Sequence, residues 1–257
     1  MIKYSASYAR MRGLKGKLVG QEQLKALLQL SDFRAVLSSL KNTVYGEQIR
    51  DLTDINLIEH ALKQDLILSY IKILTFLRGK PAALLRTFLG KFELYNVKTI
   101  ARSLIYGETN KEKIIPFIFS LGKYHTIPMD EALESENIEN FIKIMKNTPF
   151  ARPLEIGYQQ FETEKTLFPL EIALDIDYYV RLKQALDDLG PIDKLDSWEL
   201  LSLYYDIINL IWMFRFREYF KFAPEQIFQY IIPYGQNIKG ELFWKIAGES
   251  DLVRAIE

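Results

Sequence analysis

The chain has 257 residues, of which 49% are hydrophobic, and its 33 Lys and Arg residues balance 33 Asp and Glu residues. This composition excludes an intrinsically disordered chain, and it gives no overall field that would favour nucleic acid or an anionic membrane. The sequence has no cysteine, which excludes disulfides and thiolate-ligated metal sites.

The N-terminal segment carries Lys3, Arg10 and Arg12 with no long apolar run behind them, so it does not have the form of a secretory signal. The longest apolar stretch, residues 207–214, ends at Arg215 and is far shorter than the roughly 20 residues of a membrane span. We therefore expect no direct membrane span, and a cytoplasmic location unless another component anchors the protein.

Four basic residues cluster near the start of the chain: Arg10, Arg12, Lys15 and Lys17. They indicate either a solvated helix face or an electrostatic contact with an acidic partner. The two glycines among them, Gly13 and Gly16, do not form a phosphate-binding loop, because the spacing and the Ser or Thr after the lysine are missing.

Helical spacing dominates the rest of the chain. Two segments carry apolar residues at intervals of three or four, namely Ile55, Ile58, Leu62, Leu66, Tyr70 and Leu74, and then Leu167, Leu170, Leu174, Tyr178 and Leu182. Ser31, Thr53 and Ser197 are the expected N-caps. Since no stretch alternates apolar and polar residues over the length of a strand, the sequence predicts an all-α fold.

Similar segments recur along the chain, as expected of a repeat protein. The Lys-Asn-Thr of residues 41–43 returns at residues 146–148, and residues 249–252 echo residues 30–33. We therefore predict tandem helical domains in a funnel-like arrangement. Chance similarity among amphipathic helices is the alternative. The predicted units are a first repeat at residues 1–122, a second at 123–229, and a truncated third at 230–257.

The most informative recurrence is an acid-x-x-Asn element. Glu93 and Asn96 are followed by Arg102, and the same order returns 113 residues later in a set that consists of Asp206, Asn209 and Arg215. The acid and the Asn share a helix face, whereas the Arg lies roughly 240° further round the helix. We therefore expect structural polar ties, with an unpaired partner costing about 1–3 kcal/mol, and not a catalytic triad.

The remaining titratable residues do not predict a catalytic, metal or cofactor site. His60 and His125 have no second histidine or helically spaced carboxylate to share a metal ion. Asp175 and Asp177 are two residues apart, about 200° round a helix, so they do not face one ion.

Several segments, taken in order, resemble the C-subunit family of V/A-type ATPases, which is also the family of the eukaryotic V-ATPase d subunit. They are residues 8–14 (Tyr-Ala-Arg-Met-Arg-Gly-Leu), 93–102, 174–179 (Leu-Asp-Ile-Asp-Tyr-Tyr), 206–209 and 231–235. The resemblance covers nearly the whole chain. It departs from the family after Pro233, where a complete third repeat is expected and only a stub follows.

This resemblance implies a non-catalytic connector in the central stalk of a rotary ATPase or ATP synthase. Its partners would be the D and F subunits of the central shaft and the membrane rotor ring, and it would need no cofactor. Two other classes stay open: a helical adaptor that has left the rotary machine, and an all-α enzyme whose pocket would hold two convergent titratable groups.

Overall fold

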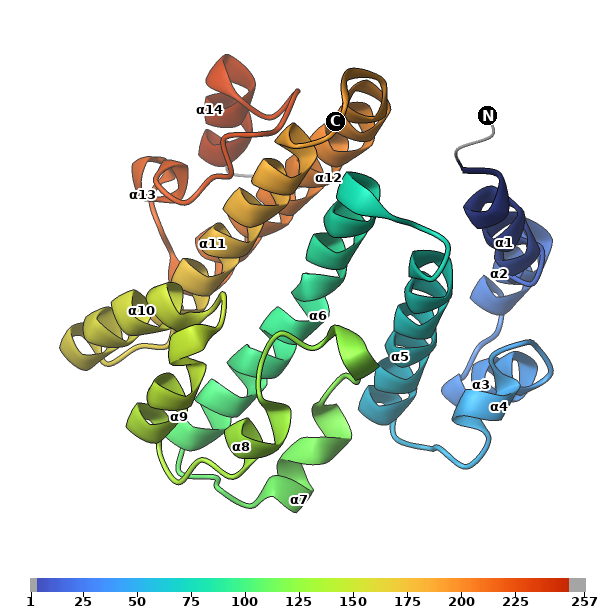
Figure 1. Ribbon diagram of the computed structural model, residues 1–257, viewed down its shortest axis with the longest axis horizontal. Helices are drawn as coiled ribbons and strands as arrows, with labels where there is room; N and C mark the ends of the chain where they lie inside the picture. The colour runs from blue at the N-terminus through green and yellow to red at the C-terminus, as the bar shows by residue number, and fades with distance from the viewer. Residues whose placement is uncertain (1–3, 250–257) are drawn as a thin grey trace. The chain divides into compact units, whose positions relative to one another are not determined.

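The computed structural model describes residues 4–249 (Figure 1). The first part of this range contains α1 (Ser5–Lys15), α2 (Gln21–Leu28), α3 (Phe33–Lys41), α4 (Gly46–Ile49), α5 (Ile55–Leu74), α6 (Gly79–Ile105) and α7 (Lys111–Ile114). The second part contains α8 (Met129–Leu133), α9 (Ile138–Ile144), α10 (Ala151–Glu164), α11 (Phe168–Asp187), α12 (Pro191–Phe220), α13 (Pro224–Phe228) and α14 (Gly240–Gly248). Short 3₁₀ turns occur at η2 (Ile115–Phe117), η3 (Gly122–Tyr124) and η4 (Met145–Asn147). Within residues 4–249 no strand occurs, which confirms the all-α prediction.

The chain divides into two compact units, unit 1 at Met1–Glu155 and unit 2 at Ile156–Glu257, with the border inside α10. This border differs from the predicted repeat border after residue 122, and the predicted start of a third repeat at residue 230 lies inside unit 2. Compactness does not test duplication, so the repeat borders stay a prediction. Residues 250–252, which echo the start of α3, lie outside the described residues.

Unit 1 is built on two long helices, α5 and α6, which lie side by side (Figure 1). Their core contains Ile67, Leu89 and Phe92 together with Phe119 and Leu121, which come from the loop around η2 and η3. A loop whose side chains enter the core must have its buried backbone groups paired. The polar residues that do this form the candidate site below.

Unit 2 is built on α11 and α12, which also lie against each other. Phe168 at the start of α11 packs among the rings of Phe216, Phe220, Phe222 and Tyr230, with centroid distances of 4.7–5.2 Å. A Cβ atom on Gly157 would lie 2.6 Å from Leu170 Cα, so only glycine lets α10 approach α11 this closely.

The helix stripes predicted for residues 55–74 and 167–182 are confirmed as α5 and α11, but the predicted caps are wrong. Asp54, not Thr53, caps α5 by accepting hydrogen bonds from the amides of Asn56 and Leu57. Asp32, not Ser31, caps α3, and Ser197 lies inside α12. Ser31 and Thr53 each compete with the aspartate that follows, whose carboxylate is a strong acceptor for helix N–H groups. Ser197 does not cap a helix because α12 already begins at Pro191.

Candidate functional site

The amide side chain of Asn96 holds a loop against α6 in unit 1. Its Nδ2 donates to the carbonyl oxygen of Phe119 at 2.8 Å, and the Phe119 N–H donates to its Oδ1 at 2.8 Å. Asn96 is completely buried. Both polar groups of one buried peptide position are thus paired by one side chain, and the Phe119 ring can enter the core without orphaned backbone groups.

Glu93, one helical turn earlier, binds the next part of the same loop. Its Oε1 accepts from the Thr126 N–H at 2.7 Å and the Ile127 N–H at 3.3 Å, and its Oε2 accepts from Thr126 Oγ1 at 2.5 Å. His125 Nδ1 lies 3.1 Å from Oε1. A buried carboxylate is tolerated where such donors surround it. We call Glu93, Asn96 and the loop residues that they bind the unit 1 clasp.

Two further side chains support the unit 1 clasp. Gln64 of α5 pairs both backbone groups of Ser120, at 2.9 Å each. The ring of His60 stacks on Phe119 with centroids 4.3 Å apart. Burial is the main cause that lowers the pKa of His60 below its ordinary value, with the nearby charge of Lys63 acting in the same direction. The neutral ring is therefore the form that the folded chain prefers.

Asn209 makes the corresponding contacts in unit 2. Its Nδ2 donates to the carbonyl oxygen of Ile232 at 2.9 Å, and the Ile232 N–H donates to its Oδ1 at 2.9 Å. The separation along the chain is 23 residues, the same as between Asn96 and Phe119. The two Asn side chains thus perform the same task on two different loops.

Asp206 gathers donors as Glu93 does. Its Oδ1 accepts from the Ile238 N–H at 2.9 Å, and its Oδ2 accepts from the backbone N–H and the side-chain Nδ2 of Asn237, each at 2.9 Å, and from the Gln236 N–H at 3.3 Å. Asp206 is buried, so these donors replace its hydration. Asp206, Asn209 and the loop residues that they bind form the unit 2 clasp.

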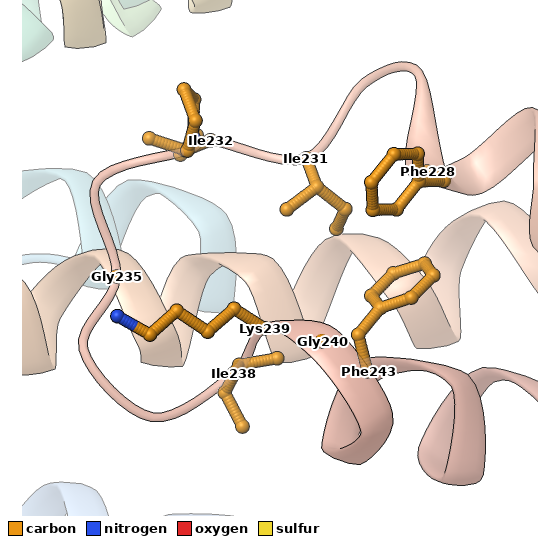
Figure 2. A pocket seen from close by; sticks show the side chains of 9 residues that line it. Phe228, Ile231, Ile232, Gly235, Ile238, Lys239, Gly240 and Phe243 are labelled. Atoms are coloured by element: carbon orange, nitrogen blue, oxygen red, sulfur yellow. The ribbon is translucent and has the colours of Figure 1, made fainter.

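The loop of the unit 2 clasp turns at Gly235. A Cβ atom there would lie 2.2 Å from Asp206 Oδ1, so the loop approaches the carboxylate this closely only because this residue is glycine. Figure 2 shows the loop leaving Phe228, turning at Gly235 and returning to Phe243 in α14. The rings of Phe228 and Phe243 meet edge to face, with their centroids 5.2 Å apart. The apolar residues of this loop line a pocket of about 290 Å³.

The two arginines of the predicted polar ties do not belong to the buried clasps. Arg102 and Arg215 are exposed on α6 and α12, whereas the acid and the Asn of each element are buried. The helical separation that the sequence predicts between Arg and the acid-Asn pair is therefore seen. Sequence reasoning missed the loop partners, above all His125, Thr126 and Asn237, because nothing in the local sequence shows which loop returns to which helix.

The basic cluster lies on and just after α1, and all four of its residues are exposed. Arg10 and Lys17 line a hollow of about 460 Å³, which also contains Glu47 and Asp65. Lys15 lines an adjoining apolar hollow of about 540 Å³ between α1 and α5. Arg12 Cζ lies 5.8 Å from the centre of the Tyr8 ring, a cation–π distance.

The chemistry available in these clasps is hydrogen bonding. Within the described range, no group of three His, Asp or Glu side chains is arranged to hold a metal ion. Across residues 4–249, no helix is both long enough and apolar enough to cross a bilayer.

Comparison with known proteins gives a consistent result. Residues 7–257 match the family described as ATP synthase (C/AC39) subunit. Among relatives, the C subunit of the A-type ATP synthase of Methanosarcina mazei is 25% identical over 242 residues, which cover 93% of this chain and 65% of the relative. The corresponding protein of Halorubrum lacusprofundi is 27% identical over 194 residues, 74% of this chain and 55% of the relative.

A third relative, the C subunit of the A-type ATP synthase of Haloferax volcanii, is 28% identical over 206 residues, 78% of this chain and 58% of the relative. The chain thus spans a little over half to about two thirds of the length of these three relatives. The match nevertheless extends over almost all of its own residues. The chain belongs to the ATP synthase (C/AC39) subunit family.

Proposed function

We propose that this protein is a non-catalytic connector in the central stalk of a rotary ATP synthase or ATPase. It would join the D and F subunits of the central shaft to the membrane rotor ring on the cytoplasmic face, and transmit torque between ATP chemistry and ion transport. The observation that carries this proposal is the family match over residues 7–257.

The two clasps support a mechanical role. In each, a long helix holds a loop through an acid and an Asn whose side chains are buried, and the loop in turn supplies buried apolar residues such as Phe119 and Ile232. Close-packed interiors have low compressibility and transmit strain. A part that carries torque needs this property in the segments between its contact surfaces.

The basic cluster on α1 is the proposed contact with an acidic partner surface. Its four residues are exposed, and two of them line a hollow that also presents the carboxylates of Glu47 and Asp65. The mixed charge suits a partner that brings acidic side chains to Arg10 and Lys17 and basic ones to Glu47 and Asp65. Such complementarity acts mainly on association rate and specificity.

Co-expression with the D and F subunits and the ring subunits from the same genome tests the proposal. A tagged chain should retain these proteins at physiological salt. Replacing all four basic residues by Glu should weaken retention at least about tenfold, since several charge contacts would reverse sign. The matched control replaces four other exposed lysines by Glu, namely Lys25, Lys80, Lys143 and Lys146.

Failure of the wild-type chain to retain any of these proteins would contradict the proposal. The alternative is a helical adaptor outside the rotary machine. Retention of none of the rotary subunits, in a genome that encodes them elsewhere, would favour that alternative.

A further inference from the structure

The ring of His125 is hydrogen-bonded through both of its nitrogen atoms. The Leu121 N–H donates to Nε2 at 3.0 Å, and Nδ1 lies 3.1 Å from Glu93 Oε1. Because a backbone N–H can only donate, Nε2 must carry a lone pair, and the proton of the neutral ring is on Nδ1. Nδ1–H therefore donates to the Glu93 carboxylate, and the ring joins α6 to its own loop in one defined tautomer.

The bond to Leu121 closes a turn at residues 121–125, which we call the His125 turn. It includes η3, and within it the Tyr124 N–H donates to the carbonyl oxygen of Leu121 at 3.1 Å. Leu121 is only 1% exposed, and its side chain belongs to the core built on α5 and α6. Within residues 4–249 the ring of His125 is the only acceptor for the Leu121 N–H, and a buried N–H without an acceptor is destabilising.

A second proton on this ring has only one place to bind. It must occupy Nε2, since Nδ1 already carries a proton. Two donors, Nε2–H and the Leu121 N–H, would then face each other across the 3.0 Å that separates the two nitrogen atoms. The bond to Leu121 is therefore lost, whereas the bond to Glu93 becomes charge-assisted and stronger. The His125 side chain is 20% exposed, so a proton from the solvent can reach it.

Glu93 is the charged group that acts most strongly on this ring. Its side chain is 1% exposed, so water screens its charge little, and the carboxylate favours the added proton. Arg86 of α6 and Lys123 of η3 lie over the ring of Tyr124, at 5.9 and 5.5 Å from its centroid. On α5, His60 prefers the neutral form. The other charged groups of α6, η3 and the start of α8 are exposed to solvent, which screens them: Arg86, Lys123, Asp130 and Glu131.

We propose that the His125 turn is a proton-sensitive switch in the loop of the unit 1 clasp. Proton uptake at Nε2 releases the Leu121 N–H, while the ring stays bonded to Glu93 and the turn loses its tie to the ring. Unit 2 has no equivalent, because no histidine occurs among residues 156–257. This switch goes beyond the proposed stalk function and does not depend on it.

Nuclear magnetic resonance of the isotope-labelled 257-residue chain tests the switch between about pH 8 and pH 5, a range that brackets the ordinary pKa of histidine. The chain has two histidines, so His60→Ile leaves only the ring signals of His125. At the higher pH, the nitrogen chemical shifts should show a bare Nε2 and a protonated Nδ1. As the ring takes up its second proton, the Leu121 amide should exchange at least about tenfold faster relative to the Phe119 amide.

The Phe119 amide is a suitable reference, because it lies in the same loop and is bonded to Asn96. The ratio of the two rates removes the pH dependence that all amides share. His125→Gln is the matched control, since its side-chain amide can accept from the Leu121 N–H and donate to Glu93 without titrating. In this variant the ratio should not change with pH.

The ring signals and the exchange ratio of the wild-type chain decide the proposal even if His125→Gln does not fold. A protonated Nε2 at pH 8, or a ring that stays neutral down to pH 5, would overturn it. An exchange ratio that does not follow the titration of the ring, or one that changes equally in folded His125→Gln, would also overturn it.

Discussion

The acid of the unit 1 clasp is a glutamate, that of the unit 2 clasp is an aspartate, and the loops that they hold differ accordingly. Glu93 reaches the amides of Thr126 and Ile127 and also the side chains of His125 and Thr126. Asp206 is one methylene shorter, and the loop comes to it through Gly235, where any Cβ atom would meet the carboxylate.

The glycine at the corresponding place in unit 1 is needed for a different reason. Gly122 lies 113 residues before Gly235, and it has a φ of +55° with open space around the position of a Cβ atom. In unit 1 the glycine serves a left-handed turn, whereas in unit 2 it serves close approach to the acid. The Asn side chain makes the same two hydrogen bonds in both units. The acid, in contrast, accepts hydrogen bonds from a different set of donors in each unit.

Removal of the acid of a clasp should have the largest effect on the free energy of unfolding. Asp206→Ala should lower the free energy of unfolding of unit 2 by about 3–4 kcal/mol, because three backbone amides and the Asn237 side chain lose a charged acceptor. All three tryptophans of the chain, Trp198, Trp212 and Trp244, lie in unit 2. Denaturant titration followed by their fluorescence therefore reports this unit.

Glu93→Ala is the counterpart in unit 1 and should leave the tryptophan transition of unit 2 within about 0.5 kcal/mol of wild type, because Glu93 and Asp206 share no hydrogen-bond partner. If Glu93→Ala shifts that transition as far as Asp206→Ala does, then the two clasps do not act within their own units.

Removal of the Asn side-chain amide should have the second-largest effect on the free energy of unfolding. Asn96→Ala and Asn209→Ala should each cost about 2–3 kcal/mol, because each leaves one buried N–H and one buried C=O without a partner. The two costs should agree within about 0.5 kcal/mol, since each side chain makes the same two bonds over the same separation. Limited proteolysis with fragment analysis can assign the loss to a unit. Costs that differ by more than about 2 kcal/mol would show that the clasps are not equivalent.

Substitution of Gly235 and of Gly122 by Ala should destabilise the two units for different physical reasons. Gly235→Ala should cost about 2 kcal/mol, because the added methyl group forces the loop away from Asp206. Gly122→Ala should cost about 1 kcal/mol, the penalty of a left-handed conformation for alanine. When Asp206 is already replaced by Ala, the free energy of unfolding that Gly235→Ala removes should be smaller. The free energy that Gly122→Ala removes should be the same with or without Asp206→Ala. A thermodynamic cycle of these variants measures the coupling.

The smallest effect is a pH dependence confined to unit 1. Because burial lowers the pKa of His60, protons bind more tightly to the unfolded chain, and the free energy of unfolding falls as the pH decreases through about 6.5. The stabilisation is fully present above that pH. In unit 2, Ile172 follows Glu171 as His60 follows Glu59 in unit 1. Ile172 is buried and does not titrate.

His60→Ile copies this residue into unit 1 and should reduce the loss of stability between about pH 7.5 and 5.5. Comparison with the wild-type chain in the same buffers isolates the contribution of this side chain. An equal slope in both proteins would mean that another group causes it.

The helical class and the polar elements could be predicted from the sequence, whereas the loop contacts could not. Stripes such as Ile55 to Leu74 follow from local periodicity, and the repeated acid and Asn are visible because they share a spacing. The partner of Asn96 lies 23 residues away, and that of Glu93 lies 33 residues away. No periodicity connects them, because their approach is set by how Phe119 packs into the core of unit 1.

The helix caps and the glycines also could not be predicted from the sequence alone, although they depend on residues that are closer along the chain. Thr53 and Asp54 are both acceptable N-caps, and only the observed hydrogen bonds distinguish them. Gly235 looks like an ordinary turn residue until Asp206 is placed beside it.

Amide hydrogen exchange at Phe119 and Ile232 tests the central claim that each clasp holds the loop of its own unit. In the wild-type chain both amides should exchange slowly, as buried groups bonded to Asn96 and Asn209. Asn96→Ala should accelerate exchange at Phe119 by about tenfold or more and leave Ile232 protected, and Asn209→Ala should do the reverse. Fast exchange at both amides in the wild-type chain, or protection that survives both substitutions, would contradict this account.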